Sequence, residues 1–517
     1  MRAHPADVAH AARSAVRVAA GGVICLLSVA SPVLAHGDLL VEAVKNRDTV
    51  AVATLLEQSV DVNIPQPDGA TALHWAAHWD DLALASRLIR AGAHLNAVND
   101  YGVTPLLLAC TDASAAMIET LLKAGANPNA ALPNGQTALM AAARTGKLDG
   151  VKALLAGGAD VNAKETVKGQ TGLMWAVAES HLEVVRTLIA QGANIKARSN
   201  NGATPLLFAA RQGDIELARL LLTHGADVNE SDSSGTSVLL MATVRGHVEL
   251  AQFLLEQGAN PNADGAGYTA LHWAAGKWET GFTTDYSYAP GTTAEWAAVV
   301  GLPRGKLELI EALLAHGANV NARLTRRPPQ SSRTLFKQEL LRGATPFYLA
   351  ALVGDTEVMR LLLAHGADTR ATADDKTTPL MVAAGFAHQD TESVIPESSY
   401  LDGVRLLVGL GADVSAVNDD GWTALHAAAY VGHQTVVQFL LDHGAKLNQK
   451  TKYGQTALGI SEGYCRLRLV NGRIEPMTAC IIGFRPDMAA YLRKLGAVSA
   501  GKVELDSSGQ LVVTSSN

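Results

Sequence analysis

Apolar and small residues recur along most of the chain in one repeating arrangement. Each copy has a turn with Gly, then Thr-x-Leu-x-x-Ala, a short break, and an apolar segment that ends in two large aliphatic residues before Gly-Ala-x-x-Asn. In the copy at 214–225, Ile215, Ala218 and Leu222 lie on one stripe of a helix that stops at Gly225. The pattern therefore predicts two short helices in every copy.

A threonine or its equivalent is expected to cap the first helix of each copy, because its hydroxyl can accept a hydrogen bond from a backbone N–H at the helix start. The Leu and the Ala pair that follow place one large and two small side chains on the packing face, so neighbouring helices can approach closely. Most intervals between the caps are about 33 residues. The caps are Thr71, Thr104, Thr137, Thr171, Thr204, Ser237, Thr269, Thr345, Thr378, Thr423 and Thr456.

One copy cannot bury its own apolar face, whereas stacked copies can. The strings TALHWAA at 71 and 269, TPLLFAA at 204 and TALHAAA at 423 resemble the signature of the ankyrin repeat family. Helix-ending glycines, with Ser59 in the glycine position of an incomplete first unit, give about 12 repeats over residues 38–497. The resemblance implies an all-α solenoid of helix-turn-helix units with β-hairpin fingers, used as a scaffold for binding other proteins.

Four insertions interrupt the repeats after Gly258. Three separate the two helices of the repeats at 269, 378 and 456, and the fourth lengthens the turn before the repeat at 345. Because insertions in such arrays map to loops, often on the binding face, we expect them to wall a groove over the repeats at 269, 345 and 378. The predicted inserts are 279–305, 385–403, the segment from Cys465 to Cys480, and 323–343.

The first 35 residues read as an export signal. Arg2, Arg13 and Arg17 precede an apolar stretch, and small residues end it at Ala35. A cleaved signal is favoured over an uncleaved anchor, because the apolar run is marginal for a membrane span. The predicted organisation is a signal peptide at 1–35, regular repeats at 36–275, repeats with inserted loops at 276–497, and a polar tail at 498–517 that we expect to be mobile.

Composition narrows the classes of partner. The net charge is −7, and no basic cluster stands out, which disfavours nucleic acid. Cys110 lies in an apolar string and is expected to be buried. Cys465 and Cys480 flank a hairpin signal at Asn471-Gly472, so a disulfide between them is predicted for an oxidising compartment.

Most histidines have a structural interpretation. His74, His272 and His426 stand where the family places a hydrogen-bonded brace between turns, and others precede the glycines that end second helices, where a cation favours the helix end. No set has the short spacing of a metal site. No nucleophile elbow, zinc motif or phosphate loop is present, so no catalytic residue, metal or cofactor is predicted.

Residues that the repeat frame leaves free are the candidates for recognition, because aromatic and Arg side chains dominate binding hot spots. Trp75, Trp175 and Trp273 recur at one frame position, which favours packing. The inserted aromatic cluster, which includes Trp296, is either a recognition site or a small satellite core. The predicted partner-binding residues are Trp79, Tyr101, Arg211, Tyr268, Trp422 and Tyr430 at tips and helix ends, with Trp278, Phe282, Tyr286 and Tyr288 in the insert.

These features predict a non-enzymatic scaffold of the periplasm or cell exterior that recognises another protein through its concave face and insert loops. No stable membrane span is expected after signal cleavage. Two alternatives stay open: a small-molecule or glycan site in the walled groove, or an enzyme of unfamiliar type that uses insert residues such as Asp285, His388 or Glu392.

Overall fold

The computed structural model describes residues 36–112, 114–276, 305–326, 341–386, 397–463, 467–470, 473–476, 485–499, 502–505 and 511–514. The chain divides into two compact units, residues 1–105 and residues 106–517. The first unit contains two helix pairs, α2 (His36–Lys45) with α3 (Thr49–Glu57) and α4 (Ala72–His78) with α5 (Leu82–Arg90).

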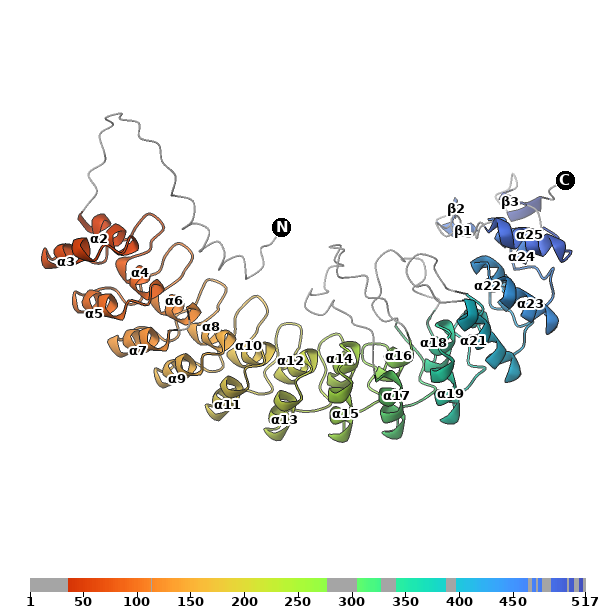
Figure 1. Cartoon of the computed structure of the whole chain (residues 1–517), viewed down its shortest axis with the longest axis horizontal. Helices are drawn as coiled ribbons and strands as arrows, with labels where there is room; N and C mark the ends of the chain where they lie inside the picture. The colour runs from red at the N-terminus through yellow and green to blue at the C-terminus, as the bar shows by residue number, and fades with distance from the viewer. Residues whose placement is uncertain are drawn as a thin grey trace, which may run out of the picture. The chain divides into compact units, whose positions relative to one another are not determined.

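The second unit continues the same arrangement of paired helices (Figure 1). Counting both units, the described helices form the twelve pairs that the repeat pattern predicts. The pairs from α6 onward are α6 (Pro105–Thr111) and α7 (Ala115–Ala124), α8 (Ala138–Thr145) and α9 (Leu148–Ala156), α10 (Gly172–Ala178) and α11 (Leu182–Ala190), α12 (Pro205–Gln212) and α13 (Ile215–Thr223), α14 (Val238–Val244) and α15 (Val248–Glu256), α16 (Ala270–Ala275) and α17 (Lys306–Ala315), α18 (Pro346–Leu352) and α19 (Thr356–Ala364), α20 (Pro379–Ala383) and α21 (Glu397–Gly409), α22 (Ala424–Val431) and α23 (Gln434–Asp442), and α24 (Ala457–Ser461) and α25 (Pro486–Lys494).

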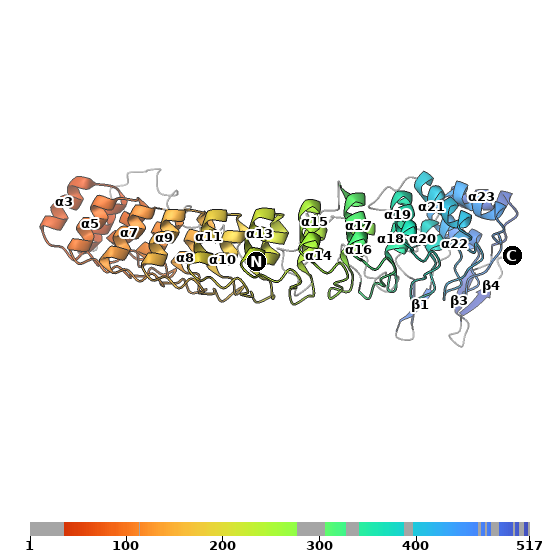
Figure 2. The ribbon, with the colours of Figure 1, turned by 90° about the horizontal axis from the view of Figure 1, so that it is seen from below.

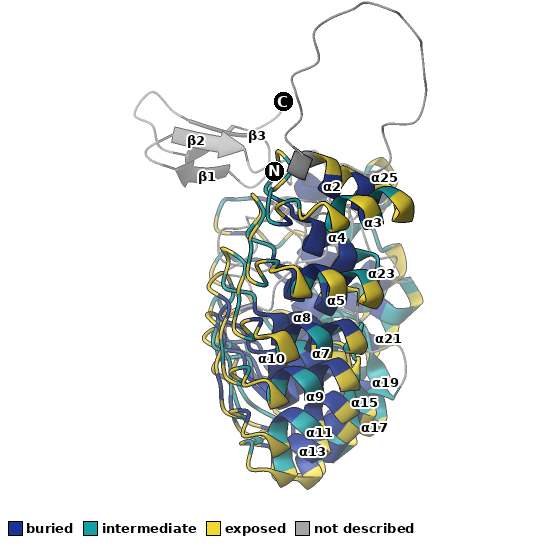
Figure 3. Ribbon diagram, turned by 90° about the vertical axis from the view of Figure 1, so that its left-hand side faces the viewer, coloured by how far each residue is buried: buried dark blue, intermediate teal, exposed yellow. Residues whose placement is uncertain are grey.

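Within the second unit, first helices contact first helices and second helices contact second helices, so the pairs stack as two layers (Figures 1 and 2). Small side chains make this approach possible: Ala209 and Ala210 of α12 are completely buried. Leu221 in the second helix of the same pair is also completely buried. The buried residues line the contacts between helices, and exposed ones lie on the outer surfaces (Figure 3). The core is thus one continuous seam between neighbouring repeats, as expected for a solenoid.

The predicted start and stop signals act as caps. Thr204 Oγ1 accepts a hydrogen bond from the Leu207 N–H at the start of α12. Gly225, after α13, has a φ of 97°, in the left-handed region that glycine enters without steric cost. Ser59, which takes the glycine position of the first repeat, also has a positive φ, of 52°.

Asparagines of the Gly-Ala-x-x-Asn motif join successive repeats. Asn229 Nδ2 donates to the Gly258 carbonyl at 3.2 Å, and the Asn260 N–H donates back to Asn229 Oδ1 at 2.7 Å. Asn129, Asn162, Asn262 and Asn321 make the same pair of bonds in their own repeats. Each asparagine therefore satisfies one carbonyl and one N–H of the next repeat.

Two predicted loop segments contain regular structure. The repeat at 378 was expected to have an insert over 385–403, but α21 begins at Glu397, and Tyr400 is buried against His433 with ring centroids 4.4 Å apart. The hairpin predicted at Asn471-Gly472 is confirmed: β1 (Leu467–Val470) pairs antiparallel with β2 (Arg473–Pro476), with Val470 opposite Arg473.

The segment 498–517, which the sequence predicts to be a polar and mobile tail, contains two strands. β3 (Lys502–Leu505) pairs antiparallel with β4 (Leu511–Thr514), with Leu505 opposite Leu511. The sequence pattern agrees with a hairpin: polar and apolar residues alternate over 502–505, and the turn-forming stretch DSSG at 506–509 separates them from the β-branched and apolar run at 511–514.

Candidate binding surface

Hairpin tips between repeats are joined by backbone hydrogen bonds, which fixes the tips in a row. In the second unit the Thr166 N–H donates to the Asn134 carbonyl at 2.8 Å, and the Asn200 N–H donates to the Lys168 carbonyl at 2.7 Å. Further along, the Asp374 N–H donates to the Arg342 carbonyl at 2.8 Å. Because each tip is anchored to its neighbour, side chains at successive tips are held at regular intervals along one edge of the stack.

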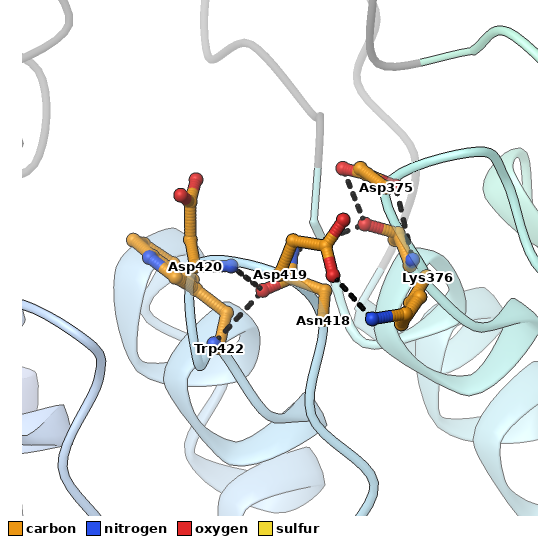
Figure 4. Close-up of polar contacts among 7 residues, drawn as sticks. Asp375, Lys376, Asn418, Asp419, Asp420 and Trp422 are labelled. Carbon is orange, nitrogen blue, oxygen red and sulfur yellow. Dashed lines mark hydrogen bonds and ion pairs between the residues drawn. The ribbon is translucent and has the colours of Figure 1, made fainter.

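The tips before α20 and α22 form a polar cluster (Figure 4). The Asp375 carboxylate accepts from the Thr377 N–H at 2.9 Å and from Thr377 Oγ1 at 2.8 Å. Asn418 Nδ2 donates to Thr377 Oγ1 at 3.1 Å, and the Asp419 N–H donates to the Asp375 carbonyl at 2.9 Å. These bonds tie the two tips together through buried Thr377 and Asn418, and the charged groups remain at the surface.

Lys376 is the unusual member of this cluster. Its φ is 63°, and it takes the tip position that Gly343, Gly421 and Gly454 occupy in neighbouring repeats, all with positive φ. Its Nζ lies 2.8 Å from Asp419 Oδ1, and this hydrogen bond raises the pKa of Lys376. The sequence pattern contained a signal for this residue, a lysine where the frame requires glycine, but our sequence reasoning assigned it no role.

Trp422 does not lie at the surface as predicted: only 6% of its area is exposed. Its backbone N–H donates to Asn418 Oδ1 at 2.9 Å, and its ring packs edge-to-face against Phe386 at 5.5 Å and Tyr430 at 6.1 Å between centroids. Tyr430 is half-buried. Within this aromatic group, Tyr430 is therefore the predicted partner-binding residue that is partly exposed.

Tyr268 is the second correction, with 7% of its area exposed. Its ring lies 6.1 Å from that of Trp273, and burial raises its pKa to about 12. Tyr268 and Trp422 follow the tip glycine and directly precede the capping threonine. That frame position points inward, since Ala203 and Ala344, which share it, are completely buried. The side chain that is exposed at a tip belongs to the residue before the glycine, as for Tyr101.

Arg211 lies at the end of α12, half-buried, with its guanidinium carbon 5.5 Å from the centroid of the Phe208 ring. Arg144 occupies the same position at the end of α8, 5.2 Å from the ring of Trp175. His247 Nε2 lies 3.0 Å from the Arg211 carbonyl oxygen, which links this helix end to the next repeat. The arginine side chains are thus positioned along the helix-end surface of the first-helix layer.

Trp79 and Tyr101 belong to the first unit. Trp79 is half-buried at the end of α4, where its ring stacks on that of Trp75 at 6.0 Å. Tyr101 is 68% exposed at a tip, and its N–H donates to Asn99 Oδ1 at 3.0 Å. Both side chains reach the surface, as the frame positions indicate.

The other predicted site residues lie outside the described part of the chain. They are the insert aromatics and the two cysteines. The partner-binding role of the insert, the predicted disulfide and the walled groove therefore stay predictions. The residues concerned are Trp278, Phe282, Tyr286, Tyr288, Trp296, Cys465 and Cys480.

The histidines of the Thr-x-Leu-His motif form the predicted brace. The Thr423 N–H donates to His426 Nδ1 at 3.1 Å, and His426 Nε2 lies 3.0 Å from the Gln449 carbonyl oxygen. Nδ1 is therefore an acceptor and Nε2 a donor, which is the neutral imidazole. Burial lowers the pKa of His426 and of His272, which makes the same contacts, to about 4.

Comparison with known families decides the classification. A family model described as ankyrin repeats in three copies matches residues 40–131, 89–165, 118–199, 139–232, 206–283, 296–395 and 393–471, which together span most of the chain. The chain belongs to the ankyrin repeat family.

Individual relatives of this ankyrin repeat protein match smaller parts. Transient receptor potential cation channel subfamily V member 5 of Oryctolagus cuniculus is 45% identical over 67 residues, which is 12% of this chain and 8% of the channel. The crystal structure of the human ASB11 ankyrin repeat domain is 30% identical and covers 43% of this chain and 98% of its own, with a TM-score of 0.39. The chain thus matches less than a tenth of the channel's length.

Ankyrin repeats generally mediate protein–protein interaction. In the part of this ankyrin repeat protein that the structure describes, no three His, Cys, Asp or Glu side chains gather in a way that could hold a metal ion. Nor does any described helix combine the length and apolar character needed to cross a membrane. The surface features to be explained are therefore the arginines at helix ends, the aromatic residues beside them and the charged tips.

Proposed function

We propose that this ankyrin repeat protein is a non-enzymatic scaffold of the periplasm or cell exterior that binds a partner protein. In the second unit the contact surface is the helix-end and tip surface, defined by Arg144, Arg211, Tyr430, Lys376 and Asp419. The observation that carries the proposal is the position of these side chains: they stand at frame positions that the core does not require, on tips and helix ends that hydrogen bonds hold in place.

Arg and Tyr at such positions suit protein recognition. Each presents a large, partly apolar side chain with hydrogen-bonding groups, and these residue types are enriched among interface hot spots. Arg211 and Arg144 are ordered beside aromatic rings, so less conformational entropy is lost when a partner immobilises them. A partner that follows the row of tips would contact several repeats at once.

The proposed location rests on residues 1–35. Their basic start, apolar centre and small residues ending at Ala35 are those of a cleaved export signal, and the first helix of the repeat array begins at the next residue, His36. The test is fractionation of cells that express the full chain, followed by N-terminal sequencing. A mature chain that starts at His36 outside the cytoplasm supports the proposal, and an uncleaved cytoplasmic chain contradicts it.

Affinity capture from envelope extract tests the binding function. The bait is the chain from His36, beside a surface variant that combines Arg144→Glu, Arg211→Glu and Tyr430→Ser. The matched control is Lys152→Glu with Lys123→Glu, which changes as much charge on exposed positions of the second helices α9 and α7. Equal thermal unfolding midpoints of the three proteins would show that the fold is intact.

The proposal predicts a partner that the unaltered chain and the control retain and that the surface variant loses. Retention by all three would place recognition outside the helix-end and tip surface. Parallel capture with a variant that lacks residues 279–303 then tests the insert, where the sequence predicts an aromatic cluster. Failure to capture any protein, together with stabilisation by a low-mass ligand or glycan, would favour the small-molecule alternative.

A further inference from the structure

The first unit contains a stack of rings and cations at the ends of α2 and α4. The rings of Trp75 and Trp79 are 6.0 Å apart and inclined by 28°. The Arg47 guanidinium carbon lies 4.1 Å from the centroid of the Trp79 ring, and Lys45 Nζ lies 5.9 Å from that of Trp75. His78 packs against Trp79 at 4.6 Å, so five side chains from two neighbouring repeats form one group.

Arg47 stands in a strained turn to reach this place. Its φ is 56°, and the same turn between the two helices of a repeat holds Gly146, Gly213 and Gly432 in some copies and Asp80 and Ser180, also with positive φ, in others. An L-residue in the left-handed region is unfavourable relative to glycine, and such outliers are a reason to look for function. The arginine is therefore present despite a conformational cost that glycine would avoid.

The guanidinium of Arg47 is exposed, and among the described residues its interactions are the ring of Trp79 and its own backbone bonds. Stacking fixes the plane of a guanidinium and leaves its N–H edge free to bind a carboxylate with two hydrogen bonds. Lys45 adds a second cation, and its Nζ forms an ion pair with the Glu42 carboxylate at 3.6 Å. The group therefore presents a forked donor and an ammonium beside two half-buried tryptophans.

We infer that this group, Lys45, Arg47, Trp75, His78 and Trp79, is the docking site for an acidic peptide segment of the partner protein. A carboxylate of the segment binds the edge of Arg47, and an adjacent apolar side chain packs beside the half-buried Trp75 and Trp79. The inference rests on the proposed function, since it names the kind of segment that the scaffold holds.

The geometry favours a peptide over a sugar. A sugar ring stacks on the open face of an aromatic side chain, but here the Trp79 ring already contacts the Arg47 guanidinium, the His78 ring and the Trp75 ring. The exposed Arg47 beside two half-buried tryptophans suits an extended chain with alternating acidic and apolar side chains. An acidic oligosaccharide shares the charge, so it serves as the competing ligand in the test.

The experiment measures binding of the chain from His36 to an immobilised library of short peptides that combine Asp or Glu with Leu and Phe. Each peptide has a twin in which Asn or Gln replaces the acidic residues. One variant is Arg47→Gly, which removes the guanidinium and places glycine, which adopts a positive φ without strain, in the turn. The other is Arg47→Lys, which keeps the positive charge but lacks the two parallel N–H donors of a guanidinium. Arg87→Ala, an exposed arginine of α5, is the control for net charge.

We expect acidic peptides to be retained and their twins not, with affinity about tenfold weaker for Arg47→Gly, intermediate for Arg47→Lys and unchanged for Arg87→Ala. Binding should weaken as salt rises. Because Arg47→Gly removes strain, its unfolding midpoint should be unchanged or higher, so weaker binding cannot be attributed to unfolding.

Several results would overturn the inference: no peptide retained, equal retention of the twins, binding by Arg47→Gly that matches the unaltered chain, or binding of oligogalacturonate in place of the peptides. The proposed function is judged separately. If envelope extract yields a partner that Arg47→Gly still captures at full strength, the scaffold function stands and this docking site is wrong. If no partner is captured by any variant, the scaffold function itself fails.

Discussion

The histidine brace offers the sharpest test of the energetics, because it links a defined geometry to pH. His426 accepts from the Thr423 N–H through Nδ1 and bonds the Gln449 carbonyl through Nε2 while almost completely buried. Protonation would place a hydrogen on Nδ1, which could then no longer accept the hydrogen bond from the Thr423 N–H. Burial, the largest cause, lowers the pKa of His426 from 6.5 to about 4.

The sign follows from proton linkage. Between pH 6.5 and about 4 the unfolded state binds a proton at His426 that the folded state does not. The contribution of the neutral His426 to the free energy of unfolding is therefore complete above pH 6.5 and is lost as the pH falls toward 4. The full shift corresponds to roughly 3 kcal/mol, of which roughly 2 kcal/mol is lost by about pH 5. His272, whose pKa is also about 4, should contribute a similar amount in its own repeat.

The assay is urea unfolding at about pH 7 and about pH 5, compared between the unaltered chain and His426→Leu. Leucine occupies this frame position as Leu207 and Leu240 in other repeats, where it is completely buried. The variant should be less stable near neutral pH, because the Thr423 N–H and the Gln449 carbonyl lose a partner, but its stability should fall less on acidification, by roughly 2 kcal/mol.

The control is His443→Gln, which removes an exposed histidine of the same repeat and leaves the buried brace intact. Hydrogen exchange of the Thr423 amide reports the same change locally, which matters because repeat arrays can unfold in segments. An identical pH dependence for His426→Leu and the unaltered chain would refute the argument.

Further substitutions test other parts of the fold by urea unfolding. Tyr348→Phe should be neutral or stabilising by up to about 1 kcal/mol, because the buried Tyr348 hydroxyl has no hydrogen-bond partner among the described residues; a loss of stability would reveal one. Asn229→Ala should destabilise by about 1 to 2 kcal/mol through two lost inter-repeat bonds, and an unchanged midpoint would contradict that role. Lys376→Gly should raise the unfolding midpoint by relieving its positive φ, and a lower midpoint would show that the Asp419 ion pair outweighs the strain. Gly421→Ala should destabilise by about 1 kcal/mol or more, since its Cβ would lie 2.6 Å from a backbone nitrogen of the next tip; an unchanged midpoint would mean that the tips can separate.

The surface residues show where reasoning from the frame succeeded and where it failed. Tyr101 precedes the tip glycine and is exposed, whereas Tyr268 and Trp422 follow the glycine and are buried. A two-place shift across the glycine of a tight turn reverses the direction of a side chain, so counting from the glycine would have separated the two cases. The frame marks Lys376 as a lysine at a glycine position, but only the structure shows its ion pair with Asp419. The role of Arg47 also required the structure, which shows its left-handed conformation and its contact with Trp79.

The sequence by itself determined the repeat, its period, the capping threonines and the glycines that end second helices, because these depend on contacts within one repeat or between adjacent ones. Short-range rules of capping, helical periodicity and turn conformation are sufficient for such contacts. The tertiary structure decided which free side chains meet. Arg47 lies on Trp79, Lys376 bonds Asp419, and each asparagine joins the next repeat, because stacking brings together residues that are one repeat apart in the chain.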